Sequence, residues 1–378
     1  MKKLFFIKKR FSIHGGGENY MRTLVDRLKG EYEITVLSSK WVETEGIRFQ
    51  KVPDRKMGLK MGSFLSTSTF NKNVCAALGE AAPHCTVSFE RTTCQDIYRA
   101  GEGCHAEWLE IRSRIEPLYK KLSFRINPLH LSLLSLEKEL FSSTGSIIAN
   151  SKMVRDNILK HYPVPPERIS IIYNGVDLMR FNPGNKGRWR KKVREGLGIR
   201  EDIKLLLFVG SGFKRKGLAA LIDAAALVKR NDIRVIVIGK GDTAAYESLA
   251  GELGVRDRIV FLPPQKEIER FYAASDLFVL PTLYDPFSNA TLEAMAAGIP
   301  VITTKANGVA ELVEEGREGL TVSNPLDTKE LAGKIESSLA GLGPMGENAR
   351  RKAEGFPIER AAVEFTEVIR RTVGARTR

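Results

Sequence analysis

The residues that could carry chemistry gather in three segments, and the first is the loop of residues 210–217, Gly-Ser-Gly-Phe-Lys-Arg-Lys-Gly. Its glycines let the backbone approach a ligand, and the cations Arg215 and Lys216 suit a phosphate. The loop is not a Walker A motif, because Leu218 stands where that motif requires Lys. It is not a dinucleotide fingerprint either, since Arg215 occupies the third glycine position. The segment predicts a phosphate-binding loop, with a solvated basic turn as the alternative.

The second segment, residues 284–293, combines a helix start with an acidic side chain. Ser288 is a favoured N-cap, and the unpaired amides at the start of a helix bind anions. Glu293 would lie more than a turn inside an Ala-rich, apolar helix, where an unpartnered carboxylate carries a large desolvation cost. Sugar hydroxyls are suitable donors to it. The alternative is a carboxylate that bonds backbone groups or a neighbouring Lys.

The third segment is the glycine run of residues 14–18, His-Gly-Gly-Gly-Glu, between a predicted strand and a predicted helix. Gly16 and Gly17 permit a close approach to phosphate. A dinucleotide fingerprint is excluded here too, because Tyr20 occupies the third glycine position. An ordinary glycine-rich turn is the alternative.

A parallel sheet must position the first two segments. In the C-terminal half, short apolar runs alternate with helix-length stretches, which is typical of a parallel sheet covered on both faces. The runs are Leu205–Val209, Val235–Ile238, Ile259–Leu262, Leu277–Leu280 and Val301–Thr303, and the helical stretches are Gly217–Arg230, Ala244–Leu253, Lys266–Ala274, Asn289–Ala297 and Val309–Glu314. Ligands of such sheets bind beyond the carboxyl ends of the strands, where both segments lie.

The N-terminal half begins in the same way, with the apolar run Lys3–Ile7 before the glycine run and an amphipathic helix. Further strand candidates are Glu33–Ser38, Thr86–Phe89, Ser146–Ala149 and Ile169–Tyr173. The polar, basic, turn-rich stretch Arg180–Arg200 is typical of a passage between domains. We therefore predict an α/β fold of two doubly wound domains with a cleft between them. Residues 360–373 are predicted to form an amphipathic helix at the end of the chain.

Composition narrows the class of protein. The 378 residues include 59 Lys and Arg against 45 Asp and Glu, a net charge of +14, which predicts an anionic partner. No run approaches the ~20 apolar residues that span a bilayer, and Leu4–Ile7 is too short an apolar run for a secretory signal. Cys75, Cys85, Cys94 and Cys104 match no zinc motif. Without an export signal we expect free thiols.

These residues together resemble family 4 of the retaining GT-B glycosyltransferases. The matching motifs are Gly-Gly-x-Glu at residues 15–18, Asn-Gly-Val-Asp at 174–177, the Arg-Lys-Gly loop at 215–217, and residues 281–301, which contain Glu293. Residues 99–109 and 210–217 are similar to lipopolysaccharide core glucosyltransferases of that family. The resemblance implies a GT-B fold of two Rossmann-like domains: residues 1–178 for the acceptor, joined by a helix within 356–378, and residues 179–355 for a nucleotide sugar.

The donor implied by the resemblance is a nucleotide-diphosphate sugar. Arg215 and Lys216 would neutralise the diphosphate leaving group, where negative charge develops. Glu293 would accept hydrogen bonds from the ribose, and Gln265 and Ile268 would hold the base. The remaining donor-binding residues that it implies are Gly16, Gly17, Phe287, Ser288, Asn289 and Ala290. Because cations and amides take the role that a metal ion has elsewhere, neither a metal nor another cofactor is expected.

Two acidic residues depart from the family's pattern. Asp285 stands where the family usually has Glu, which shortens its reach toward the transferred sugar, and Glu102 stands where the family commonly has Asp. With His105, Glu102 would lie beside the acceptor, although a structural histidine is the alternative for His105. The resemblance thus implies Asp285, Glu102 and His105 as catalytic candidates. Retention implies front-face displacement, in which the leaving phosphate helps to deprotonate the acceptor hydroxyl.

The basic surplus is then expected to serve two partners, the diphosphate and a membrane. The first 130 residues hold 22 basic and 14 acidic residues, and residues 111–130 mix basic and apolar side chains as interfacial segments do. We expect a monomer, cytoplasmic and peripheral at the inner face of the cell membrane. It would transfer a hexose from UDP-glucose or a related donor to a lipid-linked saccharide such as the lipopolysaccharide core. A GT-B sugar-nucleotide epimerase is the alternative; no nucleic-acid motif supports a nucleic-acid-binding protein.

Overall fold

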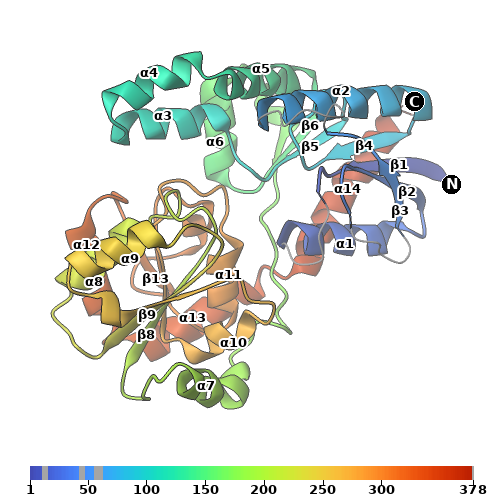
Figure 1. The fold of residues 1–378 in the computed structure, drawn as a ribbon. Coiled ribbons are helices and arrows are strands. Elements are labelled where there is room, and N and C mark those ends of the chain that lie inside the picture. Colours follow the sequence, from blue (N-terminus) through green and yellow to red (C-terminus); the bar gives the residue numbers. More distant parts are fainter. Residues whose placement is uncertain (11–15, 42–46, 55–62, 377–378) are drawn as a thin grey trace. The chain divides into compact units, whose positions relative to one another are not determined.

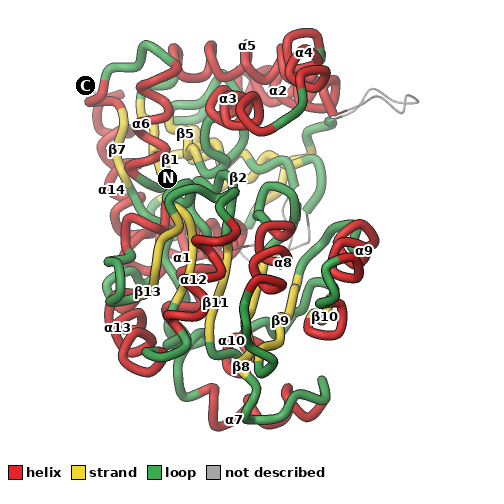
Figure 2. The backbone as a smooth tube through the Cα atoms, turned by 90° about the vertical axis from the view of Figure 1, so that its left-hand side faces the viewer, coloured by secondary structure: helices red, strands yellow, loops and turns green. Residues whose placement is uncertain are grey.

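The computed structural model describes residues 1–10, 16–41, 47–54 and 63–376. The chain divides into two compact units (Figure 1). The first comprises Met1–Tyr173 with Ile358–Arg378, and the second comprises Asn174–Pro357. In both units, helices surround a parallel sheet (Figure 2).

The first unit is built on a parallel sheet with the strand order β3-β2-β1-β4-β5-β6-β7. Its strands are β1 Lys2–Ile7, β2 Tyr32–Ser38, β3 Arg48–Lys51, β4 Cys85–Ser88, β5 Ile97–Ala100, β6 Ser146–Ala149 and β7 Ile169–Ile171. Strands β3 and β5 were not predicted. β3, Arg-Phe-Gln-Lys, lies at the edge of the sheet and lacks the apolar run that marks a buried strand.

Helices cover both faces of this sheet, and β1 shows why. Leu4 and Phe6 face a core formed with α1 (Gly16–Leu28) and α14 (Ile358–Arg376), whereas Phe5 and Ile7 face α2 (Ser63–Ala81). Alternate side chains of a strand point to opposite faces, so a strand that is apolar at every position is buried on both. The helices are α1 Gly16–Leu28, α2 Ser63–Ala81, α3 His105–Ile115, α4 Leu118–Ile126, α5 Pro128–Ser143, α6 Lys152–His161 and α14 Ile358–Arg376.

The amphipathic last helix, α14, belongs to the first unit, although it follows the second in sequence (Figure 1). Its Phe365 is fully buried and stacks on Phe89 with a centroid separation of 5.9 Å. Tyr20 of α1 donates a hydrogen bond to the carbonyl of Ala361 at 3.0 Å. The apolar face of the helix therefore completes the core over β1 and β4.

The second unit contains the strand order β10-β9-β8-β11-β12-β13. Its strands are β8 Lys204–Val209, β9 Ile233–Ile238, β10 Ile259–Leu262, β11 Leu277–Leu280, β12 Val301–Thr304 and β13 Gly319–Val322, and its helices are α7 Asn185–Gly196, α8 Leu218–Leu227, α9 Ala244–Glu252, α10 Glu269–Ala274, α11 Asn289–Ala296, α12 Thr328–Ser338 and α13 Leu342–Glu354. The predicted strands are confirmed, whereas the predicted helix at 309–314 is a short 3-10 helix, Gly308–Leu312. Every residue of β11 is fully buried, as its apolar run predicted.

The expectation that Arg180–Arg200 connects two domains was wrong. The stretch contains α7, which packs on α10 within the second unit. Arg194 is 1% exposed; it donates to the carbonyl of Ala274 at 3.0 Å and pairs with Asp276 at 2.7 Å. A helix rich in cations resembles a linker in the sequence because it has few apolar residues. In the structure, the buried hydrogen bonds of Arg194 join this helix to the rest of the second unit.

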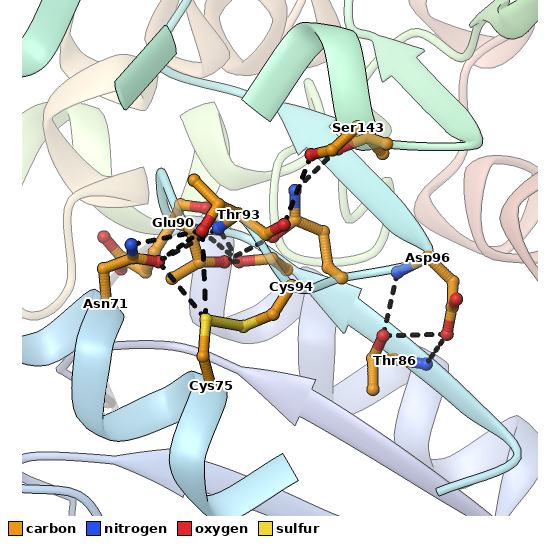
Figure 3. The surroundings of a disulfide bond; sticks show 12 residues. Asn71, Cys75, Thr86, Glu90, Thr93, Cys94, Asp96 and Ser143 are labelled. Atoms are coloured by element: carbon orange, nitrogen blue, oxygen red, sulfur yellow. Dashed lines mark hydrogen bonds between the residues drawn. A yellow bond between two sulfur atoms is a disulfide. The ribbon is translucent and has the colours of Figure 1, made fainter. Parts of the chain in front are cut away.

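The expectation of free thiols was wrong for two of the four cysteines, whereas Cys85 and Cys104 are buried and form no disulfide. Figure 3 shows Cys75 of α2 bonded to Cys94, which follows β4. The two Cα atoms lie 5.5 Å apart. Asn71, one turn before Cys75, also accepts a hydrogen bond from the amide of Thr93 at 3.0 Å. The packing of α2 brings the two cysteines together, which their spacing in the sequence does not reveal.

Candidate functional site

The loop after β8 is held in place by two of its own residues. Phe213 is buried and packs edge-on against Tyr246, with a centroid separation of 5.6 Å. Gly217 has a φ of +76° and lies so close to the chain after β11 that a Cβ there would be 1.9 Å from the carbonyl oxygen of Pro281. Only glycine fits that approach. The loop therefore lies beside the carboxyl end of β11, and Arg215 and Lys216 directly precede the contact of Gly217 with Pro281.

The two cations of this loop contact the segment that follows β11. Lys216 forms an ion pair with Asp285, in which the side chains are 12% and 6% exposed. Arg215 donates through Nη1 to the carbonyl of Tyr284 at 2.9 Å. Two candidates that came from separate segments thus meet as a pair of opposite charges that is largely shielded from water. Such shielding strengthens the electrostatic effect of both groups on a bound charge.

The backbone around Asp285 is fixed by Asn307, which the sequence reasoning missed. Asn307 is 1% exposed, and its Oδ1 accepts a hydrogen bond from the amide of Ser288 at 3.1 Å. The amide of Asp285 donates to the carbonyl of Ala306, and the amide of Gly308 donates to the carbonyl of Asp285, both at 2.9 Å. An asparagine shortly after a strand of a parallel sheet was the signal available in the sequence.

Helix α11 begins as predicted at Ser288, whose Oγ accepts a hydrogen bond from the amide of Thr291 at 3.2 Å. Phe287 is buried before the cap. Asn289 accepts a hydrogen bond from the side chain of Asn174 at 2.7 Å. The amides of residues 287–290, including Ala290, thus lie at the capped start of α11, shortly after Asp285 in the chain.

Glu293 lies one turn further along α11 and has a partner that the sequence reasoning did not foresee. Its Oε2 lies 2.9 Å from the hydroxyl of Tyr272, which is fully buried on α10. Burial raises the pKa of the Glu293 carboxyl above its ordinary range. Among the described residues, none donates a hydrogen bond to Oε1 of Glu293. One carboxylate oxygen is thus anchored, and the other can accept hydrogen bonds from a ligand.

The residues expected to hold the base lie after β10. Gln265 donates to the carbonyl of Pro263 at 2.8 Å, and Ile268 is the N-cap residue of α10. Glu269, the first residue of α10, pairs with Arg180 at 2.9 Å. The role of Gln265 and Ile268 at a base stays a prediction.

The third segment is described only in part. Gly16 and Gly17 begin α1, directly before its buried face, whereas His14 and Gly15 lie outside the described residues. The proposed contact of the glycine run with phosphate stays a prediction.

In the first unit, Glu102 follows β5 and its carboxylate forms an ion pair with Arg91. The Glu102 side chain is 55% exposed, whereas that of Arg91 is only 11% exposed. Arg91 also donates through Nε to Glu137 of α5 at 2.8 Å, and Glu137 is fully buried. The buried arginine therefore presents Glu102 at the surface.

His105 is the first residue of α3, and its Nε2 lies 3.1 Å from Nδ1 of His130 at the start of α5. Burial, together with the charge of Arg91, lowers the pKa of His105 to about 4. Burial and the charge of Arg112 lower the pKa of His130 as well. Both rings are therefore neutral at pH 7. One ring nitrogen of the pair can donate a hydrogen bond to the other, and neither ring carries a positive charge.

Arg91, Glu137 and His130 were missed by the sequence reasoning. The signal for Glu137 was available, because it lies in a helix between the apolar residues Leu136 and Leu140. The same desolvation argument singled out Glu293. Arg91 gives no comparable signal, since it lies in a loop of mixed polarity.

The basic segment of residues 111–130 contains α4, which exposes both apolar and basic side chains. Its exposed apolar residues are Leu118, Tyr119, Leu122 and Ile126, at 70%, 69%, 58% and 75%. Phe124 faces inward, with the guanidinium of Arg112 4.3 Å from its ring centroid. In the described part of the chain, no helix has the length and apolar character needed to cross a membrane.

One group of possible metal ligands is present among the described residues. Glu107, Glu110 and His161 offer ligand atoms within 4.8 Å of one another. The ammonium of Lys160 lies 2.8 Å from an oxygen of each carboxylate and offsets part of their charge. This group lies on α3 and α6, and none of the predicted catalytic or binding residues belongs to it.

Two family models match the chain. Residues 190–354 match the model described as "Glycosyl transferases group 1", and residues 99–180 match "Glycosyltransferase Family 4". The first stretch holds Arg215, Lys216, Asp285 and Glu293, and the second holds Glu102 and His105.

Curated relatives include lipopolysaccharide glucosyltransferase WaaG of Escherichia coli (strain K12), 29% identical over 278 residues, which cover 71% of this chain and 72% of WaaG. An uncharacterized glycosyltransferase of Methanocaldococcus jannaschii is 30% identical over 52% of this chain and 51% of its own length. D-inositol 3-phosphate glycosyltransferase of Rhodococcus jostii is 32% identical over 60% and 52%. The chain thus aligns with about half the length of the last two.

Solved structures share the fold. The crystal structure of WaaG superposes with a TM-score of 0.83 at 23% identity, covering 97% of this chain and 99% of that one. Anabaena HepE in complex with UDP and glucose gives 0.72 at 20% identity, with the same coverage. The fold predicted from the sequence, with two doubly wound units, is confirmed.

Proposed function

The chain belongs to the group 1, family 4 glycosyltransferases of the GT-B fold, and on this premise we propose that it transfers a hexose from a UDP-sugar, with retention of anomeric configuration, to a lipid-linked saccharide. The observation that carries the proposal is the shielded pair of Lys216 and Asp285 beside the start of α11. It places a cation, a carboxylate and helix amides within one small region at the carboxyl ends of β8 and β11.

In the proposed mechanism, Arg215, Lys216 and the amides of Phe287, Asn289 and Ala290 bind the diphosphate, while the amide of Ser288 donates to Asn307. They stabilise the negative charge that grows on it as the bond to the sugar breaks. Asp285 accepts hydrogen bonds from the hexose, and Oε1 of Glu293 accepts them from the ribose. These cations and amides supply the charge stabilisation that a divalent metal would otherwise provide, so we propose a metal-independent reaction.

Retention follows from displacement on one face of the sugar. The bond between the anomeric carbon and the diphosphate oxygen breaks, and the acceptor oxygen bonds to the anomeric carbon from the same side. The acceptor hydroxyl gives its proton to the leaving phosphate. Glu102 and the neutral His105 orient the acceptor hydroxyl by hydrogen bonds.

UDP and glucose are the donor components that we favour. The HepE structure contains UDP and glucose, and WaaG is a glucosyltransferase of lipopolysaccharide. The exposed apolar and basic residues of α4 suit an anionic membrane surface, where a lipid-linked acceptor would lie. We therefore propose that the protein acts at the cytoplasmic face of the membrane.

A screen of UDP-, GDP- and ADP-hexoses tests the proposal. The true donor should raise the melting temperature and should be consumed fastest in the presence of a lipid extract, because a ligand that binds the folded state stabilises it. NMR of the product should show the anomer of the donor. An inverted linkage would refute the mechanism, and an epimerised UDP-sugar formed without acceptor would support an epimerase instead.

A further inference from the structure

Glu137 of α5 is a fully buried carboxylate in a helix that is otherwise apolar at its buried positions. Its oxygens lie 2.8 Å from Nε of Arg91, 2.8 Å from the amide of His105 and 2.8 Å from the hydroxyl of Tyr162. All three neighbours can donate a hydrogen bond. An ionised carboxylate only accepts hydrogen bonds, so it can satisfy them together.

The first consequence concerns His105. Helix α3 begins at His105, and its N-cap residue Cys104 makes no side-chain capping hydrogen bond. Glu137 caps the helix from α5 instead, since its oxygens accept from the amide of His105 at 2.8 and 3.0 Å and approach the amide of Ala106 at 3.4 Å. A carboxylate at a helix N-terminus is also favoured by the helix dipole. The position of His105 thus depends on Glu137.

The second consequence concerns Glu102. Arg91 divides its guanidinium among three acceptors: Nε donates to Glu137, Nη2 to the carbonyl of Gly103 at 3.2 Å, and Nη1 to the carboxylate of Glu102. With its side chain only 11% exposed, Arg91 has little freedom to move. Glu137 therefore fixes the arginine that in turn holds Glu102.

We propose that Glu137 is a positioning residue that sets the geometry of Glu102 and His105 together for the acceptor hydroxyl. The inference rests on the proposed function, because it takes these two residues as the acceptor side of the reaction. Glu137 is buried and touches no substrate. It acts through Arg91 on one residue and through a backbone amide on the other.

The test compares Glu137→Gln with Glu139→Gln on the same helix; Glu139 is exposed, and its side chain makes no hydrogen bond or ion pair with any described residue. A glutamine at 137 turns an NH2 group toward donors, so it keeps the side-chain volume but loses part of the cap. We expect E137Q to reduce kcat for transfer roughly 10- to 100-fold, as a misplaced group does. Stabilisation by UDP should be unchanged, because the candidate donor residues other than Gly16 and Gly17 lie in the other unit. E139Q should match the wild type.

A double-mutant cycle separates positioning from a purely structural role. If Glu137 acts through Glu102, the E137Q change should have a smaller effect on kcat in an E102Q background than in the wild type. Tyr162→Phe removes one hydrogen bond of Glu137 but neither the cap nor Arg91, so it should lower the melting temperature and leave kcat within about twofold. Should E137Q fail to fold, Arg91→Lys tests the same link, since a lysine cannot bridge both acids.

The outcomes distinguish this inference from the proposed function. A wild type that transfers no hexose refutes the proposed function and, with it, the basis of the inference. A wild type that transfers normally while E137Q keeps its kcat and acceptor KM within twofold overturns the inference alone. A loss of activity in Y162F that equals the loss in E137Q would also overturn the inference.

Discussion

Lys216 and Asp285, 69 residues apart in the sequence, form an ion pair whose side chains are 12% and 6% exposed. The pair joins the loop after β8 to the segment after β11, and it brings together the cation proposed for the diphosphate and the carboxylate proposed for the sugar. A pair at this depth affects both folding and the reaction, and variants can separate the two effects.

Lys216→Ala should lower the free energy of unfolding by about 3–5 kcal/mol, because Asp285 is then a buried charge without its partner. Transfer should fall about 10²–10³-fold, as it does when one group that stabilises developing charge is removed. The double variant K216A/D285N should regain most of the stability and none of the activity. Urea unfolding and initial rates measure the two effects. Recovery of activity in the double variant would contradict the role of Lys216.

Glu293→Gln should change the pH dependence of stability in a defined direction. The pKa of Glu293 is raised in the folded state, so the free energy of unfolding falls as pH rises from about 4.5 through that raised value. E293Q removes this fall while keeping the shape of the side chain. Urea unfolding between pH 4 and pH 8 shows the difference. With its amide oxygen accepting from Tyr272, the glutamine turns an NH2 group toward the ribose in place of the acceptor Oε1, so binding of UDP should weaken about tenfold. Unchanged affinity would exclude Glu293 from the donor site.

His105 should titrate far below its ordinary range. Its pKa falls from 6.5 to about 4 in the folded protein, so its contribution to stability is complete above pH 6.5 and is lost as pH drops from 6.5 to about 4. The groups acting on it are Arg91, Glu137, His130 and Arg112. NMR titration of the imidazole, assigned with His105→Asn, should give a midpoint near 4. A midpoint near 6.5 would show that the ring is solvated and would remove the argument for a neutral His105.

Reduction of the Cys75–Cys94 bond should lower the free energy of unfolding by about 3 kcal/mol, the entropic effect of opening a loop of this length. The variant C75S/C94S should have the stability of the reduced protein and should not respond to dithiothreitol. Denaturant unfolding with and without reductant measures this. Equal stability in both conditions would mean that the bond does not form in solution.

The outward face of α4 should bind vesicles that contain phosphatidylglycerol and should not bind vesicles of pure phosphatidylcholine. Binding should weaken with salt, since each cation near an anionic surface contributes about 1 kcal/mol. Leu122→Glu combined with Ile126→Glu should abolish co-sedimentation. Leu253→Glu, a change at a side chain that is 40% exposed in the other unit, should have no effect. Failure of the wild-type protein to bind at low salt would refute the membrane proposal.

Much of the fold was predictable because a strand that is buried on both faces has an unbroken run of apolar residues in the sequence. Runs such as Leu277–Leu280 are apolar at every position, and only a strand covered on both faces requires that. Strand β3, which lies at an edge, and helix α7, which is mostly polar, have no such apolar run. The sequence reasoning missed the first and took the second for a linker.

The features of the candidate site likewise fall into those that lie within one element and those that join separate elements. The local features could be predicted from the sequence: the glycine loop with Arg215 and Lys216, the cap at Ser288, and an acid inside an apolar helix at Glu293. The partners of these groups became visible only in the folded chain: Asp285 for Lys216, Tyr272 for Glu293, Cys94 for Cys75, and Glu137 for both Arg91 and the amide of His105. Periodicity and capping depend on neighbours within one element. Contacts between side chains depend on how separate elements pack, and no local pattern in one of them encodes that.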